Sequence, residues 1–375
     1  MKSEWTTRSI SDIAEINPRE SISKGSIAKK IPMDVLQPFT RDVPGYQMEK
    51  FKGGTKFRNM DTIMARITPC LENGKTAQVR CLDNGEVGFG STEYIVFRAK
   101  EGTDPDYLYY LICSPLVRDP AIKSMVGSSG RQRVQTDVVA NLQIAVPDFD
   151  EQKNIGGLLK ALDDKIQLNT AINKNLLQQA SSIYQAWFED FVLSDGSCPS
   201  DWSQGTLSDI ADITNGKRPP FKSSEKTDTA VIPLVGAASV MGYTTEANHT
   251  DKILVIGRVG THGVVQRFNS PCWTSDNTLV ITSDLYEYTF QILQRIDYHA
   301  MNRGSTQPLI TQGDMNKVSI LIPDKETLSN FENLVGQLMK QYEANLLENV
   351  KLAELRDTLL PRLMSGDLDV SLLDL

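Results

Sequence analysis

Two loops of the chain combine arginine and glutamine with small polar residues. The first is Ser128-Ser-Gly-Arg-Gln-Arg-Val134, and Arg303-Gly-Ser-Thr-Gln-Pro308 stands at the corresponding place in the second half of the chain. Arginine and glutamine can each form paired hydrogen bonds with base edges, while Ser, Thr and glycine backbone suit phosphate groups. Either loop alone is equally well explained as a solvated surface loop. Because the composition recurs at matching places, we favour contact with nucleic acid.

Further cations stand near the ends of expected strands. Arg66 lies near the end of the apolar run 62–67 and Arg258 near the end of the run 253–259, while Lys217 and Arg218 belong to the cluster Asn215-Gly-Lys-Arg218. Each could contact phosphate or base edges. For Arg66 and Arg258 a second interpretation stays open, in which each lies inside its domain and holds a loop by hydrogen bonds.

No set of residues with the spacing of an active site accompanies these cations. Asp148, Glu151 and Lys153 have the residue types of a nuclease metal site. They share the first turn of one expected helix, however, where acids interact favourably with the helix dipole. The three histidines lack metal-ligand spacing, and the phosphate-binding G-x-x-x-x-G-K-[ST] and nucleophile G-x-S-x-G motifs are absent. The sequence therefore predicts a non-catalytic protein without a metal or cofactor of its own.

The composition is that of an ordinary globular protein, with 40% hydrophobic residues, 23% charged residues and a net charge of −8. Residues 1–146 carry 20 Lys+Arg against 17 Asp+Glu, and residues 204–323 carry 10 against 11, so the acidity lies mainly elsewhere. These near-neutral segments permit a DNA-binding surface. Five scattered cysteines indicate free thiols in a reducing compartment. A polar start and the lack of an apolar run of about 18 residues predict a cytoplasmic protein with no membrane partner.

The chain consists of two similar halves. Residues 5–16 return as 202–213, both beginning Trp-x(4)-[IL]-Ser-Asp-Ile-Ala, and residues 147–176 return without a gap as 323–352. Each half combines short strand-like runs with a long helical segment. We expect two mixed α/β domains (1–147 and 204–323), a linker (192–203) and two long helices (148–191 and, with the C-terminal tail, 324–375). Pro361 predicts that the second helix ends or kinks near Leu360.

Both helical segments place apolar residues at alternating steps of four and three, the pattern of a coiled-coil seam. Two asparagines interrupt each seam, Asn169 and Asn173 in the first segment and Asn345 and Asn349 in the second. If the helices pack antiparallel, Asn169 faces Asn349 and Asn173 faces Asn345, and this polar layer fixes the helix register. The alternative is that the asparagines point to water where the helices separate.

Several motifs make the chain similar to the specificity subunits of type I restriction-modification systems. They are the Trp-containing start of each half, the helix opening Ile144-Ala-Val-Pro-Asp-Phe-Asp-Glu-Gln-Lys153, the helix end Tyr184-Gln-Ala-Trp-Phe-Glu-Asp-Phe191 and the terminal Leu359-Leu-Pro-Arg-Leu-Met-Ser-Gly-Asp-Leu-Asp-Val370. The resemblance covers the whole length. It implies an α+β fold in which two mixed α/β target-recognition domains are separated by two long antiparallel helices that form a coiled coil, with a pseudo-twofold internal repeat.

The resemblance also implies a function. Each recognition domain would read one half of an asymmetric bipartite site in double-stranded DNA, and the helices would dock two modification (methyltransferase) subunits, which restriction or translocase subunits can join. S-adenosylmethionine and ATP would bind only those partner subunits. The candidate DNA contacts are Arg66, Arg131, Gln132, Arg133, Lys217, Arg218, Arg258 and Gln307. The other interpretation, which the overall acidity favours, is a non-DNA adaptor with two partner-binding domains held apart by a coiled coil.

Overall fold

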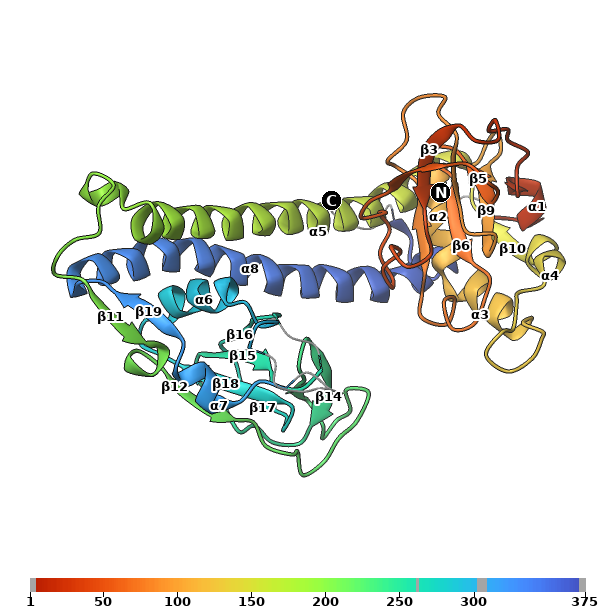
Figure 1. Ribbon diagram of the computed structural model, residues 1–375. Coiled ribbons are helices and arrows are strands. Elements are labelled where there is room, and N and C mark those ends of the chain that lie inside the picture. Colours follow the sequence, from red (N-terminus) through yellow and green to blue (C-terminus); the bar gives the residue numbers. More distant parts are fainter. Residues whose placement is uncertain (1–4, 261–262, 302–308, 371–375) are drawn as a thin grey trace. The chain divides into compact units, whose positions relative to one another are not determined.

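The chain divides into two compact units that resemble each other. The computed structural model describes residues 5–260, 263–301 and 309–370. Unit 1 comprises Met1–Thr170 and Leu346–Leu375, and unit 2 comprises Ala171–Asn345. Each unit contains one mixed α/β domain and part of each of the two long helices, α5 (Phe149–Tyr184) and α8 (Lys325–Met364) (Figure 1). The predicted fold class, with an internal repeat of domain and long helix, is confirmed.

The domain in unit 1, domain 1, contains two four-stranded sheets. The first is antiparallel with the order β2-β9-β6-β7, and the second has the order β4-β3-β8-β5, in which β3 and β8 run parallel. A separate pair, β1 and β10, places the first strand beside the strand that leads into α5. The strands are β1 (Thr6–Ser9), β2 (Ala14–Ile16), β3 (Ile27–Ile31), β4 (Gln47–Lys50), β5 (Thr55–Phe57), β6 (Thr62–Ala65), β7 (Thr76–Gln78), β8 (Gly88–Gly90), β9 (Tyr94–Ala99) and β10 (Gln143–Val146). The short helices are α1 (Ile10–Ile13), α2 (Pro105–Cys113), α3 (Pro115–Lys123) and α4 (Thr136–Ala140).

The domain in unit 2, domain 2, repeats this topology. The antiparallel sheet β12-β18-β15-β16 corresponds to β2-β9-β6-β7, the mixed sheet β14-β13-β17 corresponds to β4-β3-β8, and the pair β11–β19 corresponds to β1–β10. The strands are β11 (Ser203–Thr206), β12 (Asp212–Asn215), β13 (Ile232–Val235), β14 (Val240–Thr244), β15 (Ile253–Gly257), β16 (Gln266–Phe268), β17 (Trp273–Thr274), β18 (Thr278–Thr282) and β19 (Ser319–Ile322). The helices are the 3-10 turn η3 (Leu207–Asp209), α6 (Tyr286–Arg295) and α7 (Gln312–Asn316).

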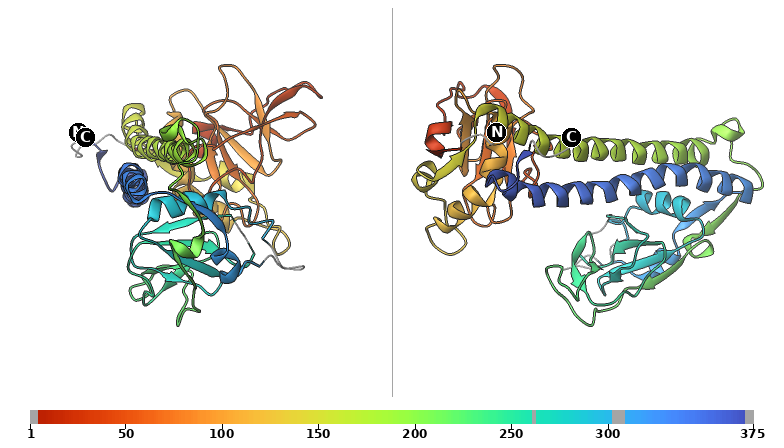
Figure 2. Two further views of the ribbon diagram at one scale, coloured as in Figure 1. Left: turned by 60° about the vertical axis from the view of Figure 1, so that its left-hand side comes forward. Right: turned by 180° about the vertical axis from the view of Figure 1, so that it is seen from behind.

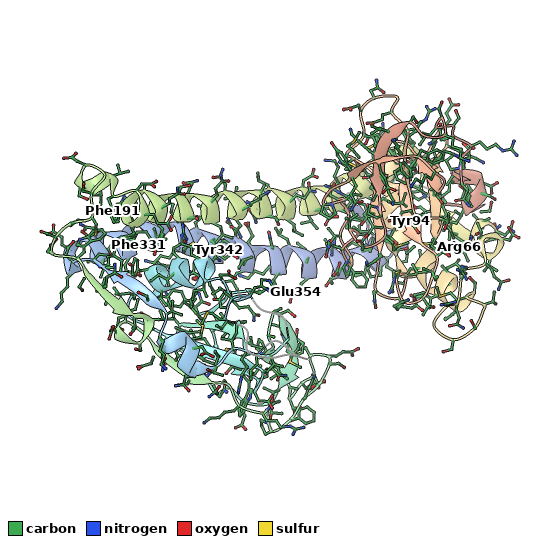
Figure 3. The ribbon with its side chains drawn as sticks, in the orientation of Figure 1. Arg66, Tyr94, Phe191, Phe331, Tyr342 and Glu354 are labelled. Atoms are coloured by element: carbon green, nitrogen blue, oxygen red, sulfur yellow. The ribbon has the colours of Figure 1, made fainter. Side chains whose placement is uncertain are left out.

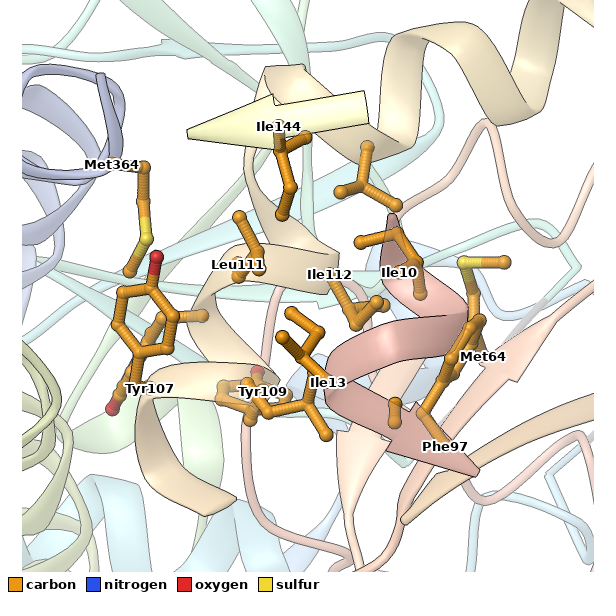
Figure 4. Packing of buried hydrophobic residues seen from close by; sticks show 14 of the residues in the cluster. Ile10, Ile13, Met64, Phe97, Tyr107, Tyr109, Leu111, Ile112, Ile144 and Met364 are labelled. Carbon is orange, nitrogen blue, oxygen red and sulfur yellow. The ribbon is translucent and has the colours of Figure 1, made fainter. Parts of the chain in front are cut away.

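The core of domain 1 is built by its central strands, its short helices and the end of α8. Ile10 and Ile13 of α1 pack with Phe97 of β9, Tyr107 of α2 and Met364 of α8, and all five are at most 1% exposed (Figure 4). Burying one such side chain stabilises a fold by about 1.5–3 kcal/mol. The last turn of α8 is therefore part of the core of domain 1.

The two long helices end in different ways. α5 continues into a π-helical turn, η1 (Gln185–Glu189), which is followed by a 3-10 turn, η2 (Val192–Ser194). α8 passes through Pro361 and ends at Met364, so an end near Leu360 is wrong by one turn, and the alternative of a kink there stays a prediction. Gly366 then stops the helix in the left-handed conformation, with φ +75°. Within the described residues, every helix is too short or too polar to cross a membrane.

Candidate nucleic-acid interface

The candidate residues of domain 1 come together at one edge of its first sheet, where β6 ends and β9 begins. Arg66 follows β6, and its backbone N–H donates to the Glu93 carbonyl at 2.9 Å. The Arg66 carbonyl accepts a hydrogen bond from the Val134 N–H, also at 2.9 Å, and an antiparallel bridge joins Ile67 to Arg133. The predicted Arg/Gln loop is thus held against the end of β6 (Figure 3, where Arg66 is labelled).

The side chains of this edge differ in how much of their hydrogen-bonding capacity is already used. Arg133 places Nε and Nη2 at 3.0 and 2.6 Å from Oε1 of Glu93, and this carboxylate raises the pKa of Arg133 above its ordinary value. Gln132 is half-buried. Arg131 is exposed, and its guanidinium has no ion-pair partner among the described residues. Arg131 is therefore the cation that can bind phosphate or a base without breaking an existing bond.

Arg66 is half-buried, and its side chain is partly committed inside the domain. Its Nη2 donates to the Val134 carbonyl at 3.3 Å, which is the kind of internal hydrogen bond that the sequence left open for this residue. Its Nε is buried and has no partner among the described residues. A DNA contact by Arg66 stays a prediction.

Domain 2 brings its candidates to the corresponding edge, around the start of β18. Arg258 follows β15, and its N–H donates to the Asn277 carbonyl at 2.9 Å. Gly216 donates its N–H to the Thr278 carbonyl at 3.0 Å, which places Lys217 and Arg218 next along this edge. Both cations are exposed. The fourth candidate, Gln307, lies outside the described residues.

The two edges are built by the same backbone contacts. The Arg258 carbonyl accepts a hydrogen bond from the Ile310 N–H at 3.0 Å, as the Arg66 carbonyl does from Val134. The N–H of each arginine donates to the carbonyl of the residue just before the neighbouring strand, β9 in domain 1 and β18 in domain 2. The Nε of Arg258 is also buried without a partner among the described residues. The equivalence shows a shared scaffold, on which each domain presents its own set of side chains.

Sequence reasoning missed two residues of these edges. Glu93 holds Arg133, and no spacing signal distinguishes it from other surface acids. Trp273 in β17 donates its indole N–H to the Lys217 carbonyl at 2.7 Å, so an aromatic ring stands beside a candidate cation. Aromatic faces can stack on unpaired bases and nucleotides. A single tryptophan in a polar segment was the only signal that could have indicated it.

The predicted asparagine pairs are present in the long helices. Asn169 donates its Nδ2 to Oδ1 of Asn349 at 2.9 Å in unit 1, and Asn345 donates to Oδ1 of Asn173 at 2.8 Å in unit 2. Asn169, Asn173 and Asn345 are at most 5% exposed and form a buried polar layer, while Asn349 is half-buried. Their role in fixing the register stays a prediction.

A second polar contact joins the two long helices in unit 1. Arg356 stands where the repeat has Ala180 in the first helix, and its Nη1 lies 2.7 Å from Oδ1 of Asp163. The hydroxyl of Tyr110, in α2, donates to the other oxygen of Asp163 at 2.6 Å. Asp163 thus connects α5 both with α8 and with domain 1.

The acids at the helix starts bind the tryptophans that open each half. The indole of Trp5 donates to Oε2 of Glu151, and that of Trp202 donates to Oδ2 of Asp324, both at 3.1 Å. Hydrogen bonds from the side chain and backbone of Thr327 lower the pKa of Asp324. Asp324 also caps α8, because its Oδ1 accepts from the N–H groups of Glu326 and Thr327, both at 2.9 Å. In the described part of the chain, no group of three or more His, Cys, Asp or Glu side chains could hold a metal ion.

Comparison with known proteins identifies the family. The model of the type I restriction modification DNA specificity domain matches residues 2–178 and 199–356. The HindI specificity subunit of Haemophilus influenzae is 24% identical over 88% of this chain and 89% of its own length. The MjaIX specificity subunit of Methanocaldococcus jannaschii is 26% identical over 72% of this chain and 71% of its own. The crystal structure of the type I restriction-modification system S subunit from M. genitalium, 16% identical, covers 97% of this chain and 99% of that chain with a TM-score of 0.58, which shows a shared fold.

The two matched stretches coincide with the two halves of the internal repeat, and each contains one of the mixed α/β domains. The relatives are named as specificity subunits of restriction enzymes. The chain therefore belongs to the family of type I restriction-modification DNA specificity domains, as a non-catalytic specificity subunit with two recognition domains.

Proposed function

We propose that this protein reads an asymmetric bipartite site in double-stranded DNA, one half with each recognition domain. The observation that carries the proposal is the repeated sheet edge. In both domains an arginine after a buried central strand makes the same backbone contacts, and exposed cations stand beside it, Arg131 in domain 1 and Lys217 and Arg218 in domain 2. Because the scaffold is common and the side chains differ, the two half-sites should differ in sequence.

We assign the recognition domains to residues 1–147 and 204–323 and the spacer helices to 148–191 and 324–375. The 36 residues of α5 and the 40 residues of α8 give lengths of about 54 and about 60 Å at 1.5 Å per residue. Helices of this length suit a spacer that sets the unread gap between the half-sites, and the buried asparagines would fix its register.

The long helices would also dock the modification subunits, two in number. Exposed apolar side chains on α8 support this assignment, since Leu346, Leu347 and Val350 are 44%, 64% and 56% exposed. At about 100° per residue the three lie within an arc of about 100° on one face of α8. Exposed apolar surface of this kind marks sites of protein association. Restriction subunits would join the complex, and S-adenosylmethionine and ATP would bind the partner subunits.

The dependence of binding on salt tests the proposal. A complex of this chain with its modification subunit is used to select duplexes from a random-sequence pool, and the affinity for the selected duplex is measured at several salt concentrations. Reading of duplex DNA predicts an enriched two-part motif and a log affinity that falls steeply with log salt, by about 0.9 for each phosphate neutralised. An adaptor without DNA function would select no motif.

A further inference from the structure

Two equivalent positions on the long helices carry very different residues. Position 156 of α5 and position 332 of α8 correspond in the repeat, and they hold Gly156 and Glu332. Each lies against the N-terminus of a helix from the domain of its own unit, α2 in domain 1 and α6 in domain 2. The right-hand view of Figure 2, which is seen from behind, shows α6 lying along α8.

In domain 1, α2 provides its own cap. The Asp104 carboxylate accepts a hydrogen bond from the Tyr107 N–H at 2.8 Å. Gly156 packs directly on this cap, because a Cβ at that position would lie 2.7 Å from the Tyr107 nitrogen and 2.9 Å from Oδ1 of Asp104. Both distances are far below van der Waals contact. The long helix therefore needs glycine where it receives a helix that carries its own acidic cap.

In domain 2, α6 has no cap of its own. Its N-cap residue is Leu285, whose side chain makes no capping hydrogen bond. The long helix supplies the missing group, since Glu332 accepts from the Glu287 N–H at 3.0 Å and from the Tyr288 N–H at 2.8 Å. Burial raises the pKa of Glu332, and these two hydrogen bonds oppose the rise. In both domains, therefore, a carboxyl group accepts hydrogen bonds from the first free amides of the packed helix, Asp104 for α2 and Glu332 for α6.

A second feature confirms that α2 and α6 are equivalent. The residue two positions after each N-cap forms an ion pair with an arginine of its own domain. Asp106 pairs with Arg80, which follows β7, and Glu287 pairs with Arg267 in β16. In domain 2 the arginine also reaches the long helix, because Arg267 Nη2 lies 3.2 Å from Glu343. The side chain of Arg267 is 7% exposed. Domain 2 is thus joined to α8 by two glutamates, and the repeat has Gly156 and Gln167 at the corresponding places in α5.

We propose that positions 156 and 332 determine which recognition domain each long helix accepts. Glycine accepts a domain whose first packed helix carries an acidic cap, and glutamate accepts a domain whose helix lacks one. The reverse combinations would fail, since two carboxyl groups would compete for the same amides in one case and buried amides would lose their acceptor in the other. The consequence for DNA reading rests on the proposed function. Glu332 and Gly156 are positioning residues that hold each reading domain at a fixed orientation on its spacer helix.

A double-mutant cycle in the full-length chain tests this pairing. Glu332→Gly should lower the midpoint of thermal unfolding, by about 4 °C for a domain of this size. Leu285→Asp should lower the midpoint in the wild-type background but raise it in the Glu332→Gly background, because the new carboxylate replaces the lost cap. Leu285→Asn, which can cap without charge, is the matched control and should be less harmful than Leu285→Asp in the wild type. Equal losses from Leu285→Asp in both backgrounds would refute the proposal.

The same variants distinguish positioning from simple stability. In complex with the modification subunit, Glu332→Gly should accept DNA whose gap differs by one base pair while both half-site sequences stay the same, and Leu285→Asp should restore the original gap. Unchanged gap selectivity in Glu332→Gly would overturn the positioning role. If the wild-type complex recognised no bipartite DNA, the proposed function would fail. Even then, if Leu285→Asp lowered the unfolding midpoint of the wild type and raised that of Glu332→Gly, the pairing of cap and helix would be established.

Discussion

At the scale of single residues, the arginines of the recognition edges divide into those with internal bonds and those without. Arg133 is held by Glu93 and Arg66 by the Val134 carbonyl, while Arg131 is exposed without an ion pair among the described residues. An arginine that must leave a carboxylate to reach DNA gains less from the new contact. We therefore expect Arg131 to contribute most to recognition in domain 1.

Replacing these arginines should affect one half-site only. In complex with the modification subunit, Arg131→Ala should weaken methylation of the recognised site by about tenfold to hundredfold if the guanidinium pairs with a base, and relax one position of the first half-site. Arg133→Ala should have a smaller effect. Lys153→Ala, a change at the start of α5, is the control and should leave both half-sites intact. Loss of specificity in the second half-site after Arg131→Ala would contradict the assignment.

The sequence indicated where these cations lie but not what each one does. Residue types and recurrence were enough to single out the Arg/Gln loop. Whether an arginine is free depends on a partner distant in sequence, such as Glu93, which is 40 positions from Arg133. Local patterns carry no signal for such contacts.

At the scale of secondary structure, the long helices combine an apolar seam with polar layers. Asn169, the Asn173–Asn345 pair and the Arg356–Asp163 ion pair place polar groups between the helices, where an apolar side chain would pack more favourably. Buried polar pairs of this kind specify register at some cost in stability. The heptad pattern predicted the asparagine pairing because, in an antiparallel pair, a step forward along one helix faces an equal step backward along the other. It did not explain Arg356, since the partner Asp163 lies outside the seam positions.

Changing all four seam asparagines to leucine should raise stability and loosen the register. The midpoint of thermal unfolding should increase by several degrees, because four amides would give way to apolar contacts. The complex should then methylate sites with more than one gap length. Asn175→Leu, a change at an exposed position on α5, should leave both properties nearly unchanged. A fall in the unfolding midpoint of the fourfold variant would show that the buried amides stabilise the seam.

At the scale of the whole molecule, duplication provides two domains with one topology and different surfaces. The repeat and the two long helices followed from periodicity and from gapless similarity between the halves, and the fold class with antiparallel helices followed from the resemblance to specificity subunits. The attachment of each domain to its helix did not, since Glu332 and Gly156 differ at an aligned position and acquire meaning only beside Leu285 and Asp104. Aligned positions at which the two copies differ therefore indicate how each domain is attached to its long helix.

Mapping of methylated sites tests the central claim most directly. One heptad is inserted at equivalent places in α5 and α8, and the methylated motif of this complex is compared with that of the wild type. Seven residues lengthen each helix by about 10.5 Å, or about three base pairs of DNA. The account predicts two unchanged half-sites separated by a gap about three base pairs longer. An unchanged gap, or altered half-site sequences, would contradict it.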